Sequence, residues 1–473
     1  MGSKLKKWLG TPLPVCVSGV LYFFGTGLHP HWYLAWLAPI PVLLAAPRIS
    51  RRAAALAAFA AFALGEWNIF TYARAIIPLP VLLLLVIAPA ALFAAFVLAF
   101  RMFARRGQLV RAALSLPALW VAYEYLSEFR SPHSTFGNLA YTQMDFLPIQ
   151  QIVSLTGIWS VSFLLFLLPA GIAAIFAPRA ALRQKIAVAL GALVVFAGVL
   201  GFGWQRLHSG SQGHAVRIGL IDTDTARYPD GEASLALVRA YAEHIPSLAR
   251  DGAEVVVIPE KIGRFQESEV GESDRILEQA AQDNHVTIVA GLLHLPNLNE
   301  ARIYSPQGSL EATYEKHHML PPFESDLVAG KTRTLLHRPS GRWGVEICKD
   351  MDFPALSRQY GADGIGLLLV PAWDFVADGW LHGRMAILRG VESGFSIARS
   401  AKQGTLTITD DRGRVLAERT TGSAGFDTVV ADVPVVNEPT FYGRAGDWFA
   451  WFDLALVAII FLSPGLRPLR SAK

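Results

Sequence analysis

The sequence predicts a chain with two fold classes, a polytopic α-helical membrane bundle and a layered α/β domain. Hydrophobic residues make up 52% of the chain and charged residues 17%, a balance that is unusual for a soluble protein. Long apolar runs dominate residues 1–206, whereas residues 207–445 have the mixed composition of a globular domain. One more apolar stretch lies within residues 446–473. We therefore predict a membrane domain, an α/β domain, and a C-terminal helix with a short tail.

The lengths of the apolar segments support the membrane assignment. A helix needs about 20 mostly apolar residues to cross the hydrocarbon core, and residues 79–100 provide this length without a charge. Comparable segments of the first domain are 12–28, 32–46, 53–72, 112–126, 157–176 and 186–204. Residues 448–462 are an eighth candidate, although Asp453 interrupts them and a tail lying on the membrane surface is the alternative. We expect about eight spans.

Basic residues alternate between the two sides of these expected spans. They gather before the first span and after the second, fourth and sixth spans, and a cleaved signal peptide in place of the first span would break this pattern. The residues are Lys4, Lys6, Lys7, Arg48, Arg51, Arg52, Arg101, Arg105, Arg106, Arg111, Arg179, Arg183 and Lys185. Since loops rich in Lys and Arg stay in the cytoplasm, we expect both termini to be cytoplasmic and the α/β domain to be external. These clusters account for the net charge of +4, which needs no nucleic-acid partner.

Alternating strand and helix patterns predict the α/β domain. Residues 215–221 read as a first strand, and residues 233–250 carry apolar side chains at helical spacing. Further buried strands are expected at 255–258, 286–292 and 364–370. Such alternation favours a layered α/β fold.

Three chemically active side chains each lie beside a strand-like run. Glu260 follows the run 255–258, Lys316 lies at the edge of another short element, and Cys348 ends a short apolar run. The other cysteine, Cys16, lies in an apolar segment, so we expect Cys348 to be a free thiol. A lone thiol is more often an inert buried side chain than a nucleophile, so its neighbours must decide.

Glutamate, lysine and cysteine together support acyl transfer through a thiol. The carboxylate can take the thiol proton, and the sulfur then attacks a carbonyl to form a covalent acyl-enzyme. An ammonium group lowers the thiol pKa and stabilises the oxyanion of the tetrahedral intermediate. This chemistry needs no metal or cofactor, and a metal site formed by Cys348 with His317 and His318 fits no standard ligand spacing.

The order of these residues resembles the Glu-Lys-Cys triad of the nitrilase superfamily. The matching segments are 259–260 (PE), 316–318 (KHH) and 347–350 (ICKD). The resemblance implies an αββα sandwich. It also implies that glutamate is the general base, lysine the electrostatic stabiliser and cysteine the nucleophile, which by position are Glu260, Lys316 and Cys348.

A second resemblance runs along nearly the whole chain. Residues 136–143 (FGNLAYTQ) and 152–157 (IVSLTG) look like a membrane segment of apolipoprotein N-acyltransferases, and residues 384–394 and 440–447 resemble further motifs of that family. The family carries a nitrilase domain between its seventh and eighth spans. The resemblance implies transfer of a fatty acyl group from a membrane phospholipid, through a thioester on Cys348, to the N-terminal amine of diacylglyceryl-cysteine apolipoproteins.

The resemblance also suggests supporting residues and two departures. Glu324 stands where the acyltransferases place another functional glutamate, and Trp373 lies on a flank that can cover an acyl chain. The family usually has an aromatic residue and a glutamate after the cysteine, whereas Lys349 and Asp350 stand here. Tyr228 stands where a tryptophan is usual. The implied setting is the bacterial inner membrane, with a periplasmic α/β domain, and we expect a monomer.

Two alternatives stay open at this stage. Lys349 adds a charge beside the cysteine and keeps open a membrane-tethered carbon-nitrogen hydrolase, an amidase that passes the acyl group to water. A transporter or scaffold with a degenerate nitrilase domain would be non-catalytic. The retention of Glu260, Lys316 and Cys348 argues against the second alternative.

Overall fold

The computed structural model describes residues 12–178, 180–210, 213–225, 230–422 and 424–463. The chain forms two units, which are described separately. The helical unit comprises Met1–Ser127, Ile158–Val199 and Asp447–Lys473, and the α/β unit comprises Glu128–Gly157 and Leu200–Gly446. Residues 128–157, which the sequence places in the membrane domain, thus group with the α/β unit. The predicted division at residues 206 and 445 stays a prediction.

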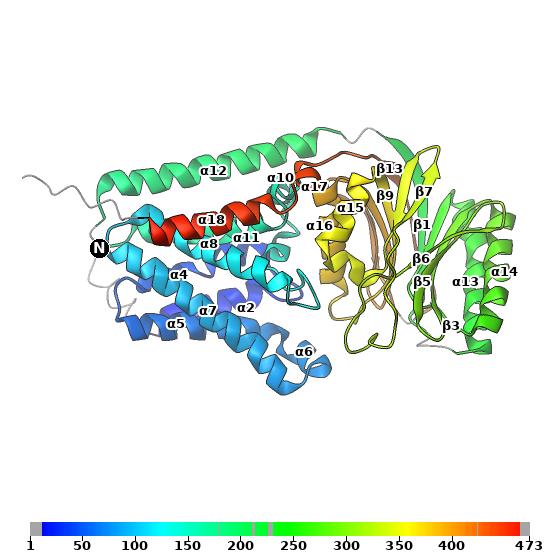
Figure 1. Ribbon diagram of the computed structural model, residues 1–473, viewed down its shortest axis with the longest axis horizontal. Helices are drawn as coiled ribbons and strands as arrows, with labels where there is room; N and C mark the ends of the chain where they lie inside the picture. The colour runs from blue at the N-terminus through cyan, green and yellow to red at the C-terminus, as the bar shows by residue number, and fades with distance from the viewer. Residues whose placement is uncertain (1–11, 179, 211–212, 226–229, 423, 464–473) are drawn as a thin grey trace, which may run out of the picture. The chain divides into compact units, whose positions relative to one another are not determined.

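The helical unit consists of apolar helices that coincide with the expected spans (Figure 1). Its elements are α2 (Leu13–Gly25), α3 (Trp32–Leu37), α4 (Ile40–Ala45), α5 (Arg51–Glu66), the 3-10 turn η1 (Trp67–Ile69), α6 (Phe70–Ile76), α7 (Leu79–Arg105), α8 (Leu109–Glu128), α11 (Trp159–Ile175), most of α12 (Leu182–His208) and α18 (Trp448–Leu462). Among the described residues, the stretches long and apolar enough to cross a membrane are Arg51–Ile76, Leu79–Arg105 and Leu182–His208. The other apolar helices are shorter. The number of spans and their orientation stay predictions.

An aromatic cluster holds the helical unit together. The ring of Phe93 lies 5.7 Å from that of Tyr22, 5.0 Å from that of Phe62 and 6.0 Å from that of Phe166. Gly65 lets α2 and α5 approach closely, since a Cβ there would lie 2.3 Å from the Cβ of Tyr22. Small residues at such contacts are typical of helices packed within membranes.

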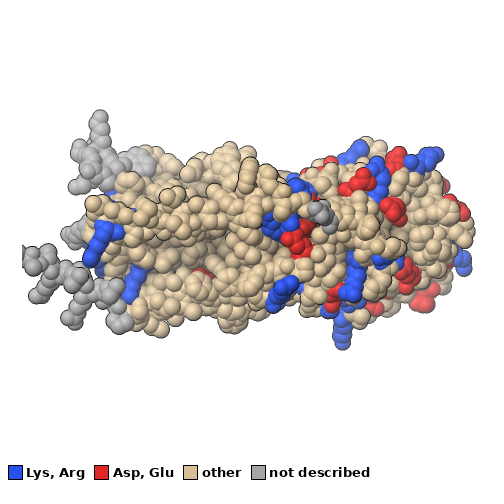
Figure 2. Space-filling view, turned by 90° about the horizontal axis from the view of Figure 1, so that it is seen from above, with Lys and Arg blue, Asp and Glu red and all other residues tan. Residues whose placement is uncertain are grey.

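Charged side chains are unevenly distributed on the helical unit. Figure 2 shows long uncharged stretches on this face of the unit, with Lys and Arg side chains gathered at one end. Arg101 links α7 to the segment that follows α4, because its Nε donates to the carbonyl of Ala46 and its Nη2 to that of Ile49, both at 2.9 Å. Lys4, Lys6, Lys7 and Arg179 of the predicted basic clusters lie outside the described residues.

The α/β unit contains two β-sheets, each built on a row of six hydrogen-bonded strands (Figure 1). The first sheet has the order β13-β1-β2-β4-β5-β6, with β3 paired to β4, and the second has the order β12-β11-β10-β9-β8-β7. The strands of the first sheet are β1 (His214–Asp222), β2 (Val255–Ile258), β3 (Arg264–Phe265), β4 (Thr287–His294), β5 (Leu298–Tyr304), β6 (Leu310–Glu315) and β13 (Asp427–Val435). Those of the second are β7 (Thr334–Arg338), β8 (Gly341–Val345), β9 (Ile365–Trp373), β10 (Ser396–Lys402), β11 (Thr405–Thr409) and β12 (Val415–Thr420).

Helices cover the outer face of each sheet. The longer helices are α13 (Glu232–Arg250), α14 (Glu267–Asn284), α15 (Pro354–Ala362) and α16 (Gly379–Ser393). The unit also has shorter helical turns, which are η2 (Leu139–Gln143), α9 (Leu147–Gln150), α10 (Val153–Thr156), η3 (Cys348–Asp352) and α17 (Phe441–Ala445). In Figure 1, α13 and α14 lie against the first sheet, and α15 and α16 against the second.

Three apolar layers follow from the alternation of side chains along the strands. Val257 of β2 packs between the sheets with Leu369 of β9, whereas the neighbouring Val256 packs under α13 and α14. Successive strand residues point to opposite faces, so a strand covered on both sides reads as a continuous apolar run. Leu368 contributes to the third layer, beneath α15 and α16. The αββα layering that the resemblance implied is confirmed.

Candidate active site

Glu260 lies where β2 ends, at a point that joins the two sheets. Its backbone N–H donates to the carbonyl of Ala372 at the end of β9, at 3.3 Å. Gly291 of β4 permits this arrangement, because a Cβ there would lie 2.5 Å from the Cα of Glu260. The Glu260 side chain is buried. Parallel pairing of β2 with β4 therefore delivers a carboxylate to the carboxyl ends of the strands.

Lys316 follows β6 and reaches the same edge. Its backbone N–H donates to the carbonyl of Asn299, and its Nζ lies 2.8 Å from Glu260 Oε1 and 2.8 Å from Glu324 Oε2. The Nδ2 of Asn299 donates to Glu260 Oε1 at 2.6 Å and to Glu324 Oε1 at 3.0 Å. These side chains are buried, so each polar group depends on the others for its hydrogen bonds. Burial acts to lower the pKa of Lys316. The charges of Glu260, Cys348 and Glu324 outweigh burial and raise this pKa well above its usual value.

Glu324 completes a balanced set of buried charges. It forms an ion pair with Lys261 as well as with Lys316, and its Oε2 accepts the backbone N–H of Leu320 at 2.8 Å. Burial acts to raise the pKa of Glu324, but the charges of Lys316 and Lys261 outweigh it and lower this pKa to about 2. Two lysines thus lie with two glutamates in the buried site, and the ammonium of Lys316 pairs with both carboxylates.

Cys348 is the first residue of η3, at the turn that follows β8. Its φ of +46° is in the left-handed region, which a residue with a side chain rarely adopts. Such strain is commonly found at functional sites. The thiol is buried and donates to the carbonyl of Trp373 at 3.3 Å. Burial and the charge of Glu260 raise the pKa of the thiol well above its usual range, and the charge of Lys316 opposes them.

Asp350 fixes the cysteine turn to the segment that carries Lys316. Its Oδ1 accepts the backbone N–H of His318 at 2.8 Å, and its Oδ2 accepts the hydroxyl of Tyr314 at 2.8 Å and the backbone N–H of Ile347 at 3.2 Å. The carboxylate is buried, and within the described residues its hydrogen bonds go to these two segments and not to the thiol or to Glu260. Asp350 therefore positions two functional segments relative to each other.

Lys349 points away from the charged cluster. Its Nζ lies 2.9 Å from Asp352 Oδ2 and 3.0 Å from His133 Nδ1, and it lies 5.8 Å from the centre of the Phe353 ring. His133 belongs to the segment 128–157, whose Thr135 also donates its hydroxyl to the carbonyl of Asp352 at 2.8 Å. The extra charge that follows the cysteine is thus already paired within the α/β unit.

The backbone carbonyl of Trp373 accepts the hydrogen bond of the Cys348 thiol, and its indole ring contacts residues at the end of β10. Its indole Nε1 donates to Gln403 Oε1 at 3.0 Å, and Lys402 Nζ lies 4.4 Å from the ring centre. The next residue, Asp374, forms a buried two-bond ion pair with Arg399, at 3.0 and 2.5 Å. This pair fixes the backbone whose carbonyl accepts the hydrogen bond from the thiol. Tyr228, the remaining predicted site residue, lies outside the described residues.

Two family models and several curated relatives match this chain. A family model described as the apolipoprotein N-acyltransferase N-terminal domain matches residues 18–171, and one described as carbon-nitrogen hydrolase matches residues 218–437. The apolipoprotein N-acyltransferase of Geobacter metallireducens is 28% identical, over 95% of this chain and 94% of the relative. That of Haemophilus ducreyi is 24% identical, over 91% and 92%.

The chain thus matches an apolipoprotein N-acyltransferase N-terminal domain followed by a carbon-nitrogen hydrolase domain, and it is similar to apolipoprotein N-acyltransferases along nearly its whole length. The family resemblance predicted from the residues is thereby confirmed. Among solved structures, a mutant of a Nesterenkonia amidase from the nitrilase superfamily is 20% identical, with a TM-score of 0.43, over 51% of this chain and 98% of that chain.

Several residues of the candidate site escaped the sequence prediction. Lys261 and Asn299 contact the glutamates directly, and Asp374 with Arg399 supports the backbone beside the thiol. A signal was present for Asn299, because a buried strand carries an amide only where the amide has partners. For Arg399 the partner lies 25 residues away along the chain. Only the pairing of β9 with β10 brings the two together.

The described part of the chain contains no group of three or more His, Cys, Asp or Glu residues that can hold a metal. The ammonium of Lys316 is a positive charge that acts on the thiol. Buried in a low dielectric, such a charge acts strongly on an oxyanion that forms nearby.

The depressed pKa of Glu324 predicts a pH-dependent contribution to stability. An unfolded glutamate titrates near pKa 4.3, whereas folded Glu324 titrates at about 2. Its stabilising effect is therefore fully present above the unfolded pKa and is lost as the pH falls toward 2. We expect Glu324→Gln to lower Tm at pH 7, with a difference from wild type that shrinks below about pH 4.3.

Thermal unfolding in detergent at several pH values measures this difference. Glu243→Gln is the control, because Glu243 is exposed on α13 and its removal should change Tm by the same small amount at every pH. A Tm difference for Glu324→Gln that stays constant down to pH 2 would contradict the assignment.

Proposed function

We propose that this chain transfers a fatty acyl group from a membrane phospholipid to the N-terminal amine of diacylglyceryl-cysteine apolipoproteins. The observation that carries the proposal is the buried contact between Lys316 and Glu260, with both charges acting on the thiol of Cys348. Relatives named apolipoprotein N-acyltransferase, aligned over 95% of the chain in one case, support the choice of acceptor.

In the first half-reaction, the sulfur of Cys348 attacks the ester carbonyl of the phospholipid. Because burial raises the pKa of the thiol, it is protonated at rest and needs a base during attack. Glu260 takes the S–H proton, and the C–S bond forms. Lys316 and the backbone N–H of Lys349, in the first turn of η3, stabilise the oxyanion. The ester C–O bond then breaks, and the lysophospholipid alkoxide takes the proton from Glu260.

In the second half-reaction, the amine of the diacylated apolipoprotein attacks the thioester carbon. Glu260 now takes the amine proton, and the same groups stabilise the second oxyanion. The C–S bond breaks and the sulfur regains the proton, so the products are an amide and the free thiol. Glu324 keeps the Lys316 ammonium between two carboxylates throughout both steps.

The helical unit fits an acyl donor held in a bilayer. Three apolar stretches long enough to span support our proposal that the chain is a multi-pass protein of the bacterial inner membrane with an external α/β unit. Fusion of the two units replaces a bimolecular encounter between enzyme and lipid. Trp373 and its neighbours then form the rim that receives the acyl chain. We propose that the enzyme acts as a monomer, with no cofactor.

Labelled phospholipid tests the choice of acceptor. With a diacylated lipopeptide present, we expect the acyl label in an amide, together with one equivalent of lysophospholipid. Without the lipopeptide, at most one acyl group per chain should be transferred. The measurement is separation of amide, free fatty acid and lysophospholipid after incubation with the purified full chain. Free fatty acid as the main product in both arms would instead support the hydrolase, and unconsumed lipid would exclude lipid acyl transfer.

A further inference from the structure

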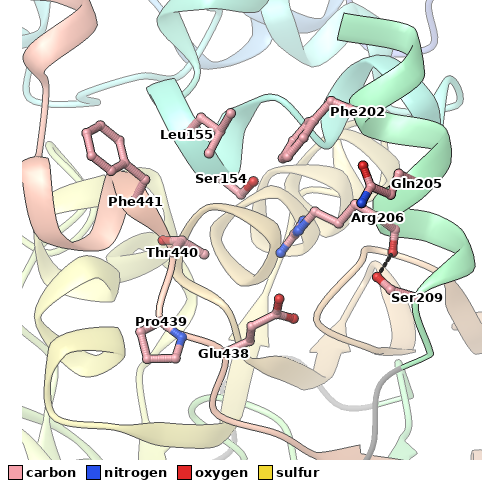
Figure 3. A pocket seen from close by; sticks show the side chains of 10 residues that line it. All are labelled: Ser154, Leu155, Phe202, Gln205, Arg206, Ser209, Glu438, Pro439, Thr440 and Phe441. Atoms are coloured by element: carbon pink, nitrogen blue, oxygen red, sulfur yellow. Dashed lines mark hydrogen bonds between the residues drawn. The ribbon is translucent and has the colours of Figure 1, made fainter. Parts of the chain in front are cut away.

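A pocket of about 290 Å³ lies at the C-terminal end of α12, within the α/β unit. Its lining comes from the last turns of α12, from α10, and from the segment that leads into α17 (Figure 3). The lining residues include none of the candidate catalytic side chains. They combine apolar rings, such as those of Phe202 and Phe441, with a single arginine, Arg206.

Arg206 is directed into this pocket with half of its guanidinium bonded. Its Nη1 donates to Gln151 Oε1 at 2.7 Å, and Gln151 is itself held by the carbonyls of Leu147 and Arg412. Within the described part of the chain, the buried Nη2 of Arg206 has no hydrogen-bond partner. The residue is only 8% exposed. Figure 3 shows the guanidinium extending between Ser154 and Glu438 toward the middle of the pocket.

Among the described residues, the Nη2 of this arginine lacks an acceptor, although the carboxylates of Asp411, Glu438 and Asp410 lie near enough to act on its charge. A buried charged donor without an acceptor costs free energy, and a guanidinium binds phosphate oxygens well. Glu438 also lines the pocket, but its carboxylate forms an ion pair with Arg412. Gln205 lies on the exposed rim and offers a side-chain amide as a further donor. The pocket therefore suits a phosphate with one apolar side.

The position of the pocket on α12 indicates where that phosphate comes from. α12 has 27 residues and extends about 40 Å, whereas the hydrocarbon core is about 30 Å thick and takes up about 20 residues. Its last turns therefore extend to the headgroup level in the proposed membrane placement. Trp204, 64% exposed, and Phe441, 52% exposed, are aromatic residues of the kind that gather at this level.

We propose that this pocket binds the phosphate of a phospholipid headgroup, at a site distinct from the acyl-transfer centre. The Nη2 of Arg206 and the amide of Gln205 donate to the phosphate oxygens, and the rings of Phe202 and Phe441 contact the glycerol and the start of the acyl chains. The inference rests on the proposed membrane placement of α12. It does not rest on the thioester chemistry.

Native mass spectrometry of the full chain tests the proposal. Every protein carries Cys348→Ala so that donor lipid is not consumed, and the titrated ligand is phosphatidylglycerol. We expect Arg206→Gln to weaken one bound lipid by roughly 10- to 100-fold, the range for losing a charge-assisted hydrogen bond. The number of lipids retained per chain should fall by one. Arg183→Gln, an exposed arginine near the other end of α12, should leave retention unchanged.

Competing ligands distinguish the source of the phosphate. Diacylglycerol, which lacks the phosphate, should not displace the lipid, and inorganic phosphate should displace it only weakly. Displacement by diacylglycerol would overturn the role of Arg206, and inorganic phosphate binding as tightly as the lipid would overturn the lipid assignment. Unchanged retention in Arg206→Gln would overturn the whole site. If that variant does not fold, Gln205→Glu, an exposed change that adds a repelling charge, must lower retention. Failure of acyl transfer would leave these readouts intact.

Discussion

Replacing Cys348 with alanine should abolish the acyl-enzyme and reduce acyl transfer by roughly 10³-fold or more, because the covalent route is lost entirely. The structure supports a direct effect on chemistry, since among the described residues the hydrogen bond of the thiol goes to the carbonyl of Trp373. Alanine keeps the Cβ and removes only the sulfur. The left-handed backbone at this position is retained by the surrounding hydrogen bonds of Asp350. We therefore expect little change in Tm.

Intact-protein mass spectrometry after incubation with phospholipid provides the measurement. Wild type should gain the mass of one fatty acyl group, hydroxylamine should remove it, and Cys348→Ala should gain nothing. Cys16→Ala is the matched control, because the other cysteine of the chain is exposed in the helical unit. That variant should acylate like wild type. An adduct in Cys348→Ala that disappears in Cys16→Ala would move the nucleophile to the helical unit.

Cys348→Ser separates nucleophile identity from site shape. Serine preserves the size of the side chain, but its hydroxyl is a far weaker nucleophile than a thiol unless a stronger base activates it. Because the Cys348 pKa is raised by burial, activation during attack depends on Glu260 in both variants. We expect slow or undetectable acylation of the serine variant. Acylation at the wild-type rate would contradict a thioester mechanism.

Much of the fold was predictable because burial leaves a simple pattern. Strand β2, buried on both faces, carries four consecutive β-branched residues, and β9 carries a similar apolar run. Such runs indicate a sheet covered on both sides. The long apolar helices were equally clear from length and composition. The apolar pattern does not indicate the order of the strands within a sheet, because β13 pairs with β1 although they lie more than 200 residues apart in the chain.

The candidate site was only partly predictable, for a physical reason. Glu260, Lys316 and Cys348 each end a strand-like run, so local sequence indicated them. The partners that hold their charges were not local. Asn299 approaches Glu260 through the pairing of β4 with β5, and Asp374 meets Arg399 through a parallel strand pair. Hydrogen-bond geometry, which periodicity does not encode, decides these contacts.

Lys349 illustrates the opposite error, in which a residue is given a chemical role because it is next to the nucleophile in the sequence. The residue follows the nucleophile in sequence and therefore suggested an altered charge at the site. In η3, however, its side chain reaches Asp352 and His133. A residue adjacent to a left-handed turn can point far from its neighbour. The sequence feature that kept the hydrolase alternative open therefore loses its support.

Replacing Lys316 with methionine should reduce acyl transfer by at least about 100-fold and should also destabilise the α/β unit. The Nζ of Lys316 lies 2.8 Å from each of two buried carboxylates, Glu260 and Glu324. Removing one partner of a buried ion pair costs about 3–5 kcal/mol, because the remaining charge is left uncompensated. Lys316 also lowers the pKa of the Cys348 thiol. Without it, the alkaline rise of thiol alkylation should move to higher pH.

A double variant distinguishes the structural effect from the catalytic one. Lys316→Met with Glu324→Gln removes one buried negative charge together with the positive charge, so Tm should recover toward that of wild type. Acyl-enzyme formation should not recover, because no ammonium remains to stabilise the oxyanion. Lys331→Met is the control, since Lys331 is exposed and its charge should not affect either readout.

The comparison of the two readouts decides the role of the lysine. If the double variant regains both stability and acylation, Lys316 serves only to neutralise the buried glutamates, and the oxyanion must be stabilised by backbone groups. If stability returns and acylation does not, the ammonium acts on the reaction itself. Single-turnover formation of the acyl-enzyme, followed by mass, is the appropriate rate, because it isolates the first half-reaction from release of the lysophospholipid.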